Sequence, residues 1–147
     1  MTRRDLIVLK DKDAVIERVA HDSRQLLAET LATSDVAHVV LTGGTVGIGV
    51  LSFLGRTDRD LPEHERVEWS RVHLWWGDER WVPTGHEDRN DAQATATFLD
   101  VLDFRPERIH RMPASDLGWS LDEAADRYSQ ELKQTVGRSD DDGSRPA

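Results

Sequence analysis

The sequence predicts an α/β fold in which helices cover both faces of a mostly parallel sheet, as in Rossmann-like domains. Short apolar runs typical of strands alternate with helical patterns, and this alternation indicates parallel strands joined by right-handed crossovers. The run Val72–Trp76 is apolar on both faces, because the adjacent Trp75 and Trp76 must point in opposite directions. A glycine turn at Gly43-Gly44 joins another apolar run to a helical pattern. The 147 residues suffice for one domain with a hydrophobic core.

The first elements are a short strand and a long helix. Leu6–Leu9 is an apolar run, for which we expect a strand. A helical pattern then begins with Asp11 or Asp13 as its N-cap and ends around Thr33-Ser34-Asp35. Its apolar residues fall mostly on one face, at Val15, Ile16, Val19, Leu26, Leu27 and Leu31.

The next unit, Val36–Gly55, consists of a strand, a glycine turn and a helix. The strand stops at Thr42-Gly43-Gly44-Thr45, and the apolar residues after it continue as a helix, although Gly47 and Gly49 weaken that prediction. This arrangement aims free backbone N–H groups and a helix N-terminus at an anion. The glycines allow a positive φ and the close approach of a ligand, and the threonine hydroxyls add donors. We therefore expect a phosphate group at this turn.

The glycine turn has other interpretations. A plain strand-to-helix turn without a ligand is equally compatible with two glycines, since glycine often marks turns. The dinucleotide-binding fingerprint requires a glycine where Ser52 stands, and the Walker pattern requires a lysine where Val50 stands. The turn therefore favours a phosphate but argues against NAD or ATP bound in the usual ways, and no cofactor is expected.

A second polar cluster follows the apolar strand Val72–Trp76. The polar stretch Arg56–Glu65 before this strand is expected to be a loop. Directly after it come Asp78, Glu79 and Arg80. Arg80 could hold a phosphate through two hydrogen bonds, and a carboxylate nearby could move a proton. Taken alone, such a cluster is more often a set of solvated ion pairs.

The position of both polar clusters favours a binding site. Ligands of parallel sheets bind at the carboxyl ends of the strands. The glycine turn at 42–45 and the charged cluster at 78–80 both follow a predicted strand. We therefore expect the two clusters to meet at one rim of the sheet.

A helix and a short strand are expected next. The helix covers roughly Asp91–Leu102, with Asp88 or Asn90 as its cap, and the strand lies within Ile109–Met112. The inner face of the helix is formed by Ala92, Thr95, Phe98, Leu99 and Leu102.

A capping box begins the last helix. Ser120 is the N-cap and Glu123 stands three residues later. Its apolar stripe consists of Leu121, Ala124, Ala125, Tyr128 and Leu132. Residues 137–147 are polar and carry no core-forming side chain, so we expect a loop or tail after a domain at residues 1–136.

Composition excludes several classes of function. The formal net charge of −9 and the pI near 5.1 disfavour nucleic acid and anionic membranes as partners. The absence of cysteine excludes disulfides and thiolate metal sites, and the string beginning at His86-Glu87 fails the zinc motif because Asn90 replaces its second histidine. His73 is expected to be a satisfied core or edge histidine. We expect a cytoplasmic protein that binds no metal.

Three strings together resemble 6-phosphogluconolactonase and its wider sugar-phosphate isomerase superfamily. They are Leu41–Thr45 (LTGGT), Gly77–Pro83 (GDERWVP) and Arg89-Asn90 before a helix. The resemblance implies hydrolysis of 6-phosphogluconolactone in the oxidative pentose phosphate pathway, without a metal. It covers essentially the whole chain.

The resemblance also implies roles for individual residues. Thr42, Gly43, Gly44 and Thr45 would surround the sugar phosphate, with Glu79, Arg80 and Asn90 as further substrate-binding residues. Asp78 would be an auxiliary catalytic carboxylate near the lactone. The family continues its glycine turn with Ser-Thr-Pro, whereas this chain has Thr45-Val46-Gly47.

One expected segment is absent from the sequence. The family carries its catalytic histidine in a later Asp-Gly-His segment, and no such string occurs among the 147 residues. The resemblance therefore implies the N-terminal portion of an enzyme, incomplete at its C-terminus. The remainder would be a separate chain or missing, and these residues alone would be inactive.

The sequence also allows two alternative functions. A sugar-phosphate isomerase or deaminase of the same superfamily differs in downstream residues, although Arg80-Trp81-Val82-Pro83 fits the lactonase better. A non-catalytic sugar-phosphate sensor of a transcription regulator would need a basic helix-turn-helix before the domain. The chain instead begins almost at once with an apolar run and is acidic.

Overall fold

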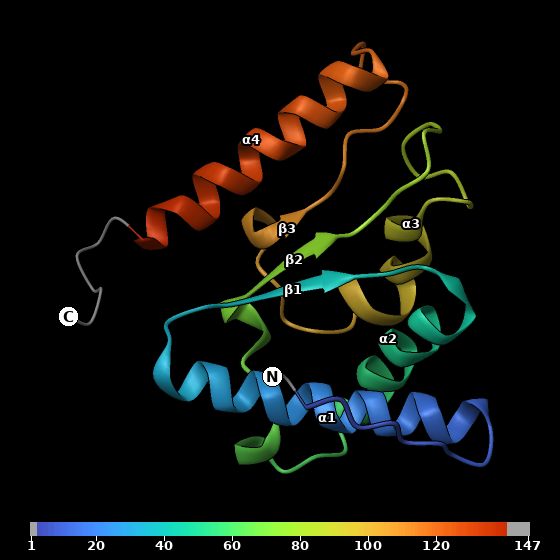
Figure 1. Cartoon of the computed structure of the whole chain (residues 1–147), viewed down its shortest axis with the longest axis vertical. Coiled ribbons are helices and arrows are strands. Elements are labelled where there is room, and N and C mark those ends of the chain that lie inside the picture. The colour runs from blue at the N-terminus through green and yellow to red at the C-terminus, as the bar shows by residue number, and fades with distance from the viewer. Residues whose placement is uncertain (1–2, 141–147) are drawn as a thin grey trace.

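The chain forms a parallel three-stranded sheet with helices packed around it. The computed structural model describes residues 3–140. The strands β1 (Ala37–Leu41), β2 (Val72–Trp76) and β3 (Ile109–His110) lie in the order β1-β2-β3 (Figure 1). Ala37 is level with Val72, and Leu74 with Ile109. The predicted α/β fold with a parallel sheet is confirmed.

Two helices form the layer on one side of the sheet. The helix α1 (Lys12–Thr33) begins as predicted, since the carboxylate of its N-cap Asp11 accepts a hydrogen bond from the backbone N–H of Ala14 at 2.8 Å. The helix α2 (Gly44–Asp58) follows β1 directly and packs against α1. It runs three residues beyond the predicted end at Gly55, into the stretch expected to be a loop.

The third helix differs from its prediction. α3 is short (Asn90–Ala94), and the chain continues as a π-helical turn, η3 (Thr95–Leu99). Short 3₁₀ turns precede β2 and β3, at Glu63–Glu65, Trp69–Arg71 and Pro106–Arg108. The predicted inner-face residues Phe98, Leu99 and Leu102 are buried even so, because the π turn keeps them on the core side.

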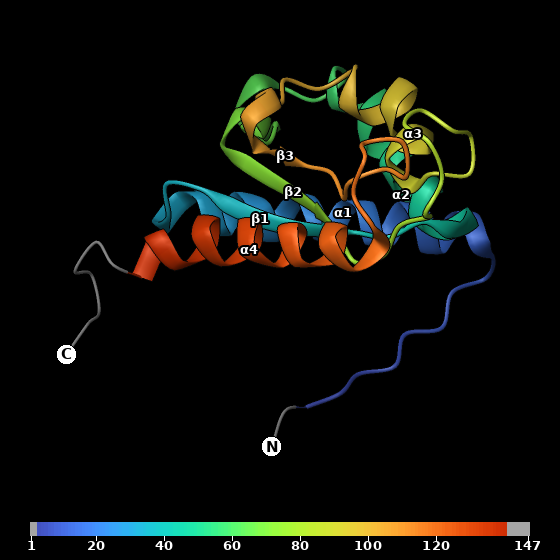
Figure 2. The same cartoon turned by 90° about the horizontal axis from the view of Figure 1, so that it is seen from above.

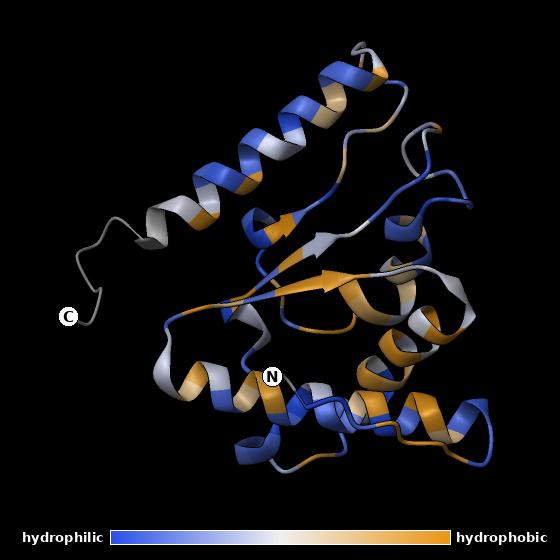
Figure 3. Ribbon diagram, viewed as in Figure 1, coloured by the Kyte–Doolittle hydropathy of each residue, from blue (hydrophilic) through white to orange (hydrophobic). Residues whose placement is uncertain are grey.

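The hydrophobic core lies between one face of the sheet and the helices α1, α2 and η3. Alternate residues of the strands supply the sheet's share of the core, and the helices contribute apolar side chains from α1, α2 and the π turn. Figure 3 shows that the ribbons of β1 and α2 consist largely of hydrophobic residues. Trp76 belongs to this core, while its neighbour Trp75 is buried on the opposite face. The main strand and helix members of the core are Ala20, Leu27, Ala37, Leu41, Val50, Leu51, Leu54, Val72, Leu74, Trp76 and Phe98.

The helix α4 (Leu121–Asp140) covers part of the other face of the sheet (Figure 2). The predicted capping box is confirmed, since Ser120 and Glu123 exchange hydrogen bonds between side chain and backbone at 3.1 and 3.2 Å. The Tyr128 hydroxyl accepts a hydrogen bond from the backbone N–H of Trp76 at 2.9 Å and donates to the carbonyl of His110. Helices therefore lie on both faces, as predicted.

A row of histidines crosses the face under α4. His73 Nδ1 lies 2.8 Å from His110 Nε2, and His110 Nδ1 lies 2.6 Å from a carboxylate oxygen of Glu131 on α4. His38 stacks on His73 and accepts a hydrogen bond from the indole N–H of Trp75. Burial, reinforced by the neighbouring histidines and Arg108, lowers the pKa of His73 to about 4.

Two predictions at the ends of the chain are wrong. Leu6–Leu9 is extended but forms no strand within the described residues, and Leu6 and Val8 are 91% and 82% exposed. Figure 2 shows this segment leading away from the body of the molecule. At the other end α4 includes residues 137–140, which were expected to be a loop, while residues 141–147 lie outside the described residues. No helix among the described residues has the length and apolarity needed to cross a membrane.

Candidate functional site

The glycine turn forms the N-terminus of α2. Gly43 is the N-cap and Gly44 is the first helical residue, with a φ of +81°. That conformation suits glycine, because a side chain in the left-handed region is strained. The first N–H groups of a helix have no partner within it, and the helix dipole places a partial positive charge there. The turn therefore offers backbone donors for an anion, as the sequence predicts.

The charged cluster lies beside this turn. The pairing of β1 with β2 continues to the first residue after β2, since the backbone N–H of Gly77 donates to the carbonyl of Leu41, the last residue of β1, at 3.0 Å. The residues after Gly77 and after Leu41 therefore leave the sheet at the same rim. This rim is the carboxyl end of parallel strands, where ligands of such sheets bind.

Asn90 joins the two loops at the start of α3. Its side-chain amide donates to the backbone carbonyl of Asp78 at 3.1 Å and lies 3.3 Å from the Asp78 carboxylate. On its other side it covers Gly43, where a Cβ would stand only 2.1 Å from the Asn90 side-chain oxygen. Only a residue without a side chain leaves room for Asn90 at this position.

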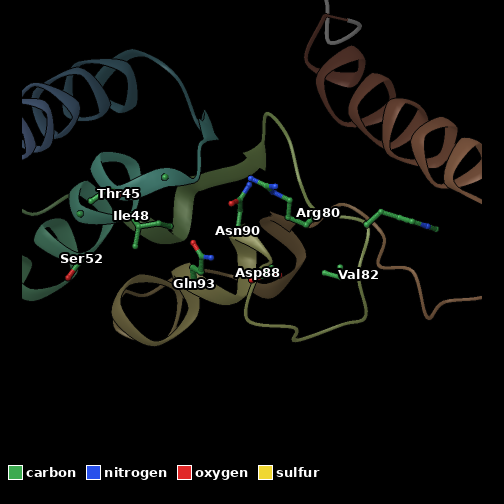
Figure 4. A pocket seen from close by; sticks show the side chains of 11 residues that line it. Thr45, Ile48, Ser52, Arg80, Val82, Asp88, Asn90 and Gln93 are labelled. Carbon is green, nitrogen blue, oxygen red and sulfur yellow. The ribbon is translucent and has the colours of Figure 1, made fainter.

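Two adjoining cavities open at this rim, and Figure 4 shows the larger of them. The larger, of about 1080 Å³, lies between α2 and the loop after β2, and Figure 4 shows Arg80 reaching over it toward Asn90. The smaller, of about 410 Å³, includes Asp78 and the glycine turn. Gly44, Arg80 and Asn90 line both. Of the eight residues predicted for the site, the structure brings seven to these cavities, namely Thr42, Gly43, Gly44, Thr45, Asp78, Arg80 and Asn90.

Glu79, which was expected to bind substrate, lines neither of these two cavities. Its side chain is 3% exposed and turns inward. The carboxylate accepts hydrogen bonds from the backbone N–H groups of Asn90 at 2.6 Å and Asp91 at 3.0 Å. The predicted caps of α3, Asp88 and Asn90, are thus wrong, because the N-cap residue is Arg89 and the capping oxygens come from Glu79.

Arg89 is the main residue of the site region that sequence reasoning assigned no role. It is 1% exposed and pairs with Asp91 through two hydrogen bonds of 3.0 Å. It also donates to the backbone carbonyls of Met112 at 2.6 Å and Arg80 at 3.3 Å. A charged residue two positions before a carboxylate is too common a pattern to reveal this bracing by itself.

The site combines a cationic and an acidic part. The Arg80 guanidinium and the N-terminus of α2 can hold an anion, while Asp78 lies beside them as a carboxylate able to accept a proton. The histidine row lies on the face of the sheet, away from both cavities. Among residues 3–140, no group of three or more metal-ligating side chains is arranged to hold a metal ion.

The chain is similar in sequence and in fold to proteins of known class. The chain is 40% identical over 129 residues to 6-phosphogluconolactonase of Streptomyces coelicolor, an alignment that covers 86% of this chain and 48% of that protein. It is 38% identical over 128 residues to 6-phosphogluconolactonase of Mycobacterium leprae, covering 85% and 49%. The chain thus spans about half the length of the curated relatives it matches.

The comparison with solved structures supports the fold. The crystal structure of 6-phosphogluconolactonase from Thermotoga maritima superposes with a TM-score of 0.73 at 21% identity, covering 86% of this chain and 52% of that one. A monomeric glucosamine-6-phosphate deaminase superposes with a TM-score of 0.69 at 18% identity, covering 88% and 49%. A family model described as glucosamine-6-phosphate isomerases/6-phosphogluconolactonase matches residues 10–146, and the chain belongs to this family.

Proposed function

We propose that this chain is the substrate-binding half of a 6-phosphogluconolactonase, which hydrolyses 6-phosphogluconolactone to 6-phosphogluconate in the oxidative pentose phosphate pathway. The observation that carries the proposal is that Gly44 and Arg80, from loops 36 residues apart in numbering, line the same two cavities. A phosphorylated sugar is small enough to contact both. The relatives at 38–40% identity bear the name of this enzyme.

The proposed roles follow from the geometry of the rim. The N-terminus of α2 and the Arg80 guanidinium bind the phosphate, and charge-assisted hydrogen bonds of this kind are the stronger ones. Asn90 holds the two loops together through Asp78 and Gly43. Asp78 is the auxiliary carboxylate, close enough to the sugar to orient water or a second catalytic group.

The proposed reaction needs a base that these residues do not supply. Attack of water on the lactone carbonyl requires a group that takes the water proton, and donors that stabilise the oxyanion. The resemblance assigns the base to a histidine in an Asp-Gly-His segment, and this string is absent from the 147 residues. In this proposal the base comes from a second polypeptide segment.

The proposed partner is a polypeptide that corresponds to the half of the relatives this chain does not match. Within the described residues β1 is an edge strand, and Val40 on it is 63% exposed. A largely apolar cavity of about 600 Å³ runs along the same strand, between α1 and α2. Unpaired backbone groups beside an apolar groove suit the addition of another strand. We place the assembled enzyme in the cytoplasm, as composition led us to expect.

Ligand binding by this chain tests the proposed site. We expect 6-phosphogluconate to bind residues 1–147 in a calorimetric titration, and Arg80→Ala to weaken binding by roughly 10- to 150-fold, the loss of a charged hydrogen bond. Arg59→Ala at the far end of α2 is the matched control and should bind like the wild type. Equal affinity of the Arg80→Ala variant would remove Arg80 from the site.

A kinetic assay tests the missing base. Residues 1–147 alone should not accelerate hydrolysis of 6-phosphogluconolactone above its spontaneous rate, followed as acid release at constant pH. The physical reason is that phosphate binding without a base binds substrate and transition state alike and does not lower the barrier. Clear turnover by the purified chain would show that the catalytic set is complete within it.

A further inference from the structure

Glu79 stands between two residues of the candidate site but is itself shielded from it. Asp78 and Arg80 line the cavities at the rim, whereas the side chain of Glu79 is 3% exposed and points toward α3. A ligand in either cavity therefore reaches Asp78 and Arg80 more readily than it reaches the Glu79 carboxylate. A buried carboxylate is costly unless it is paired and hydrogen-bonded, so its partners indicate what it does.

The partners of Glu79 are the first backbone N–H groups of α3. One oxygen accepts from Asn90 N at 2.6 Å and from Arg80 N at 2.9 Å, and the other accepts from Asp91 N at 3.0 Å. The buried Arg89 guanidinium lies 3.7 Å away and supplies the opposite charge. A side chain eleven residues upstream thus caps this helix, since Arg89 makes no side-chain cap of its own among residues 3–140.

This cap fixes the backbone from which the Asn90 side chain extends. Asn90 then reaches in two directions, to Asp78 through its amide nitrogen and to Gly43 through its oxygen. The contact with Gly43 leaves no spare room, because even a Cβ there would overlap the oxygen. A shift of the start of α3 would therefore move the glycine turn relative to the charged loop.

We propose that Glu79 is a positioning residue: by holding the N-terminus of α3 it sets the place of Asn90, and through Asn90 the spacing of the two loops that grip the ligand. The inference rests on the proposed function for its ligand, 6-phosphogluconate. It separates Glu79 from Arg80 and Asp78, which touch the ligand directly. It also explains the different places of three consecutive charged residues, since Asp78 and Arg80 line the cavities while the Glu79 side chain turns toward α3.

A thermodynamic cycle tests this role. Glu79→Gln keeps the size of the side chain but turns an NH₂ group toward a backbone donor, so it should weaken 6-phosphogluconate binding at least tenfold. In an Asn90→Ala background the same substitution should cause no further loss, because the two residues act through one path. Asp116→Asn is the matched control, since Asp116 also accepts from a backbone N–H, that of Thr84, in a neighbouring loop. It should leave affinity unchanged.

A second readout needs no ligand. In the free chain, Glu79→Gln and Asn90→Ala should both shift the amide resonances of Gly43 and Gly44, and Asp116→Asn should not. If Glu79→Gln does not fold, Glu79→Asp, which shortens the reach to α3, replaces it.

Several results would overturn the inference. Additive losses of affinity in the cycle, or a folded Glu79→Gln variant with unaltered affinity and unaltered Gly43 and Gly44 resonances, would each do so. Failure of the wild type to bind 6-phosphogluconate would instead remove the proposed function. The resonance comparison would then still decide whether Glu79 positions Asn90.

Discussion

At the scale of single residues, the closest packing in the site lies between Gly43 and Asn90. The Asn90 oxygen occupies the space that any side chain at position 43 would need. Asn90 is buried, and its amide nitrogen is already engaged by Asp78, so it has little freedom to move aside. The identity of residue 43 is therefore set by a neighbour 47 positions away and only partly by the turn itself.

Gly43→Ala should destabilise the chain. Overpacking of this kind typically costs about 1–3 kcal/mol, and denaturant unfolding would measure it. Gly77→Ala is the control, because the nearest atoms to a Cβ there lie at an ordinary 3.5 Å. The cost of Gly43→Ala should fall when Asn90 is also changed to Ala. Equal cost in both backgrounds would show that contact with Asn90 is not the cause of the destabilisation.

At the scale of the elements, the histidine row ties the three strands to α4. His38, His73 and His110 come from β1, β2 and β3, and Glu131 closes the row from α4. The pKa of His38 is lowered by burial and by His110, and burial lowers that of His73 from the ordinary value of 6.5 to about 4. The folded chain therefore favours the neutral form of both rings.

This row predicts how stability depends on pH. Because the pKa of folded His73 is below that of the unfolded chain, unfolding takes up a proton between pH 6.5 and about 4. The contribution of the neutral ring is complete above pH 6.5 and is lost as the pH falls toward 4. Urea unfolding across this range should show a smaller loss of stability for His73→Gln than for the wild type. The same loss in both would contradict the assignment.

The elements also show what sequence patterns can and cannot predict. The Asp11 cap, the Ser120 capping box and the turn at Gly43-Gly44 are local, so spacing along the chain was enough to predict them. The capping of α3 is not local, since Glu79 lies eleven residues before Asn90. No pattern within α3 could therefore have indicated that the inward-facing member of the charged cluster is Glu79.

Two further differences have a similar cause. Leu6–Leu9 has the composition of a strand, but a strand also needs a partner, and none is present among the described residues. Gly49 weakened the prediction of α2, yet a Cβ there would stand 2.5 Å from the Ile16 side chain of α1. Both the missing pairing and the close approach of two helices are tertiary facts, which override local propensity.

At the scale of the whole molecule, the two sides of the sheet are unequally covered. One face carries the core, whereas α4 covers only part of the other. Within the described residues β1 also lies at the edge of the sheet, and Val40 on it is largely exposed. Exposed apolar side chains also remain on the extended N-terminal segment, at Leu6, Ile7 and Val8. An edge strand with apolar neighbours is a template for pairing with another chain.

We therefore expect residues 1–147 to associate with themselves at high concentration when purified alone. Val40→Lys should lower the average mass measured by sedimentation, because a charge on an edge strand opposes pairing. Gln25→Lys on the exposed surface of α1 adds the same charge elsewhere and should leave the mass unaltered. A wild-type chain that stays monomeric throughout would argue against an open edge at β1.

Within residues 3–140, β1 pairs with a strand on one side only, and its carboxyl end leads directly into the glycine turn. Suppose that a second polypeptide covers the other side of β1 and adds groups to the same rim. The factor by which it raises the affinity for the sugar phosphate must then equal the factor by which the sugar phosphate raises the affinity for the polypeptide. The sugar phosphate would then stabilise the complex of the two polypeptides, and its depletion would favour their dissociation.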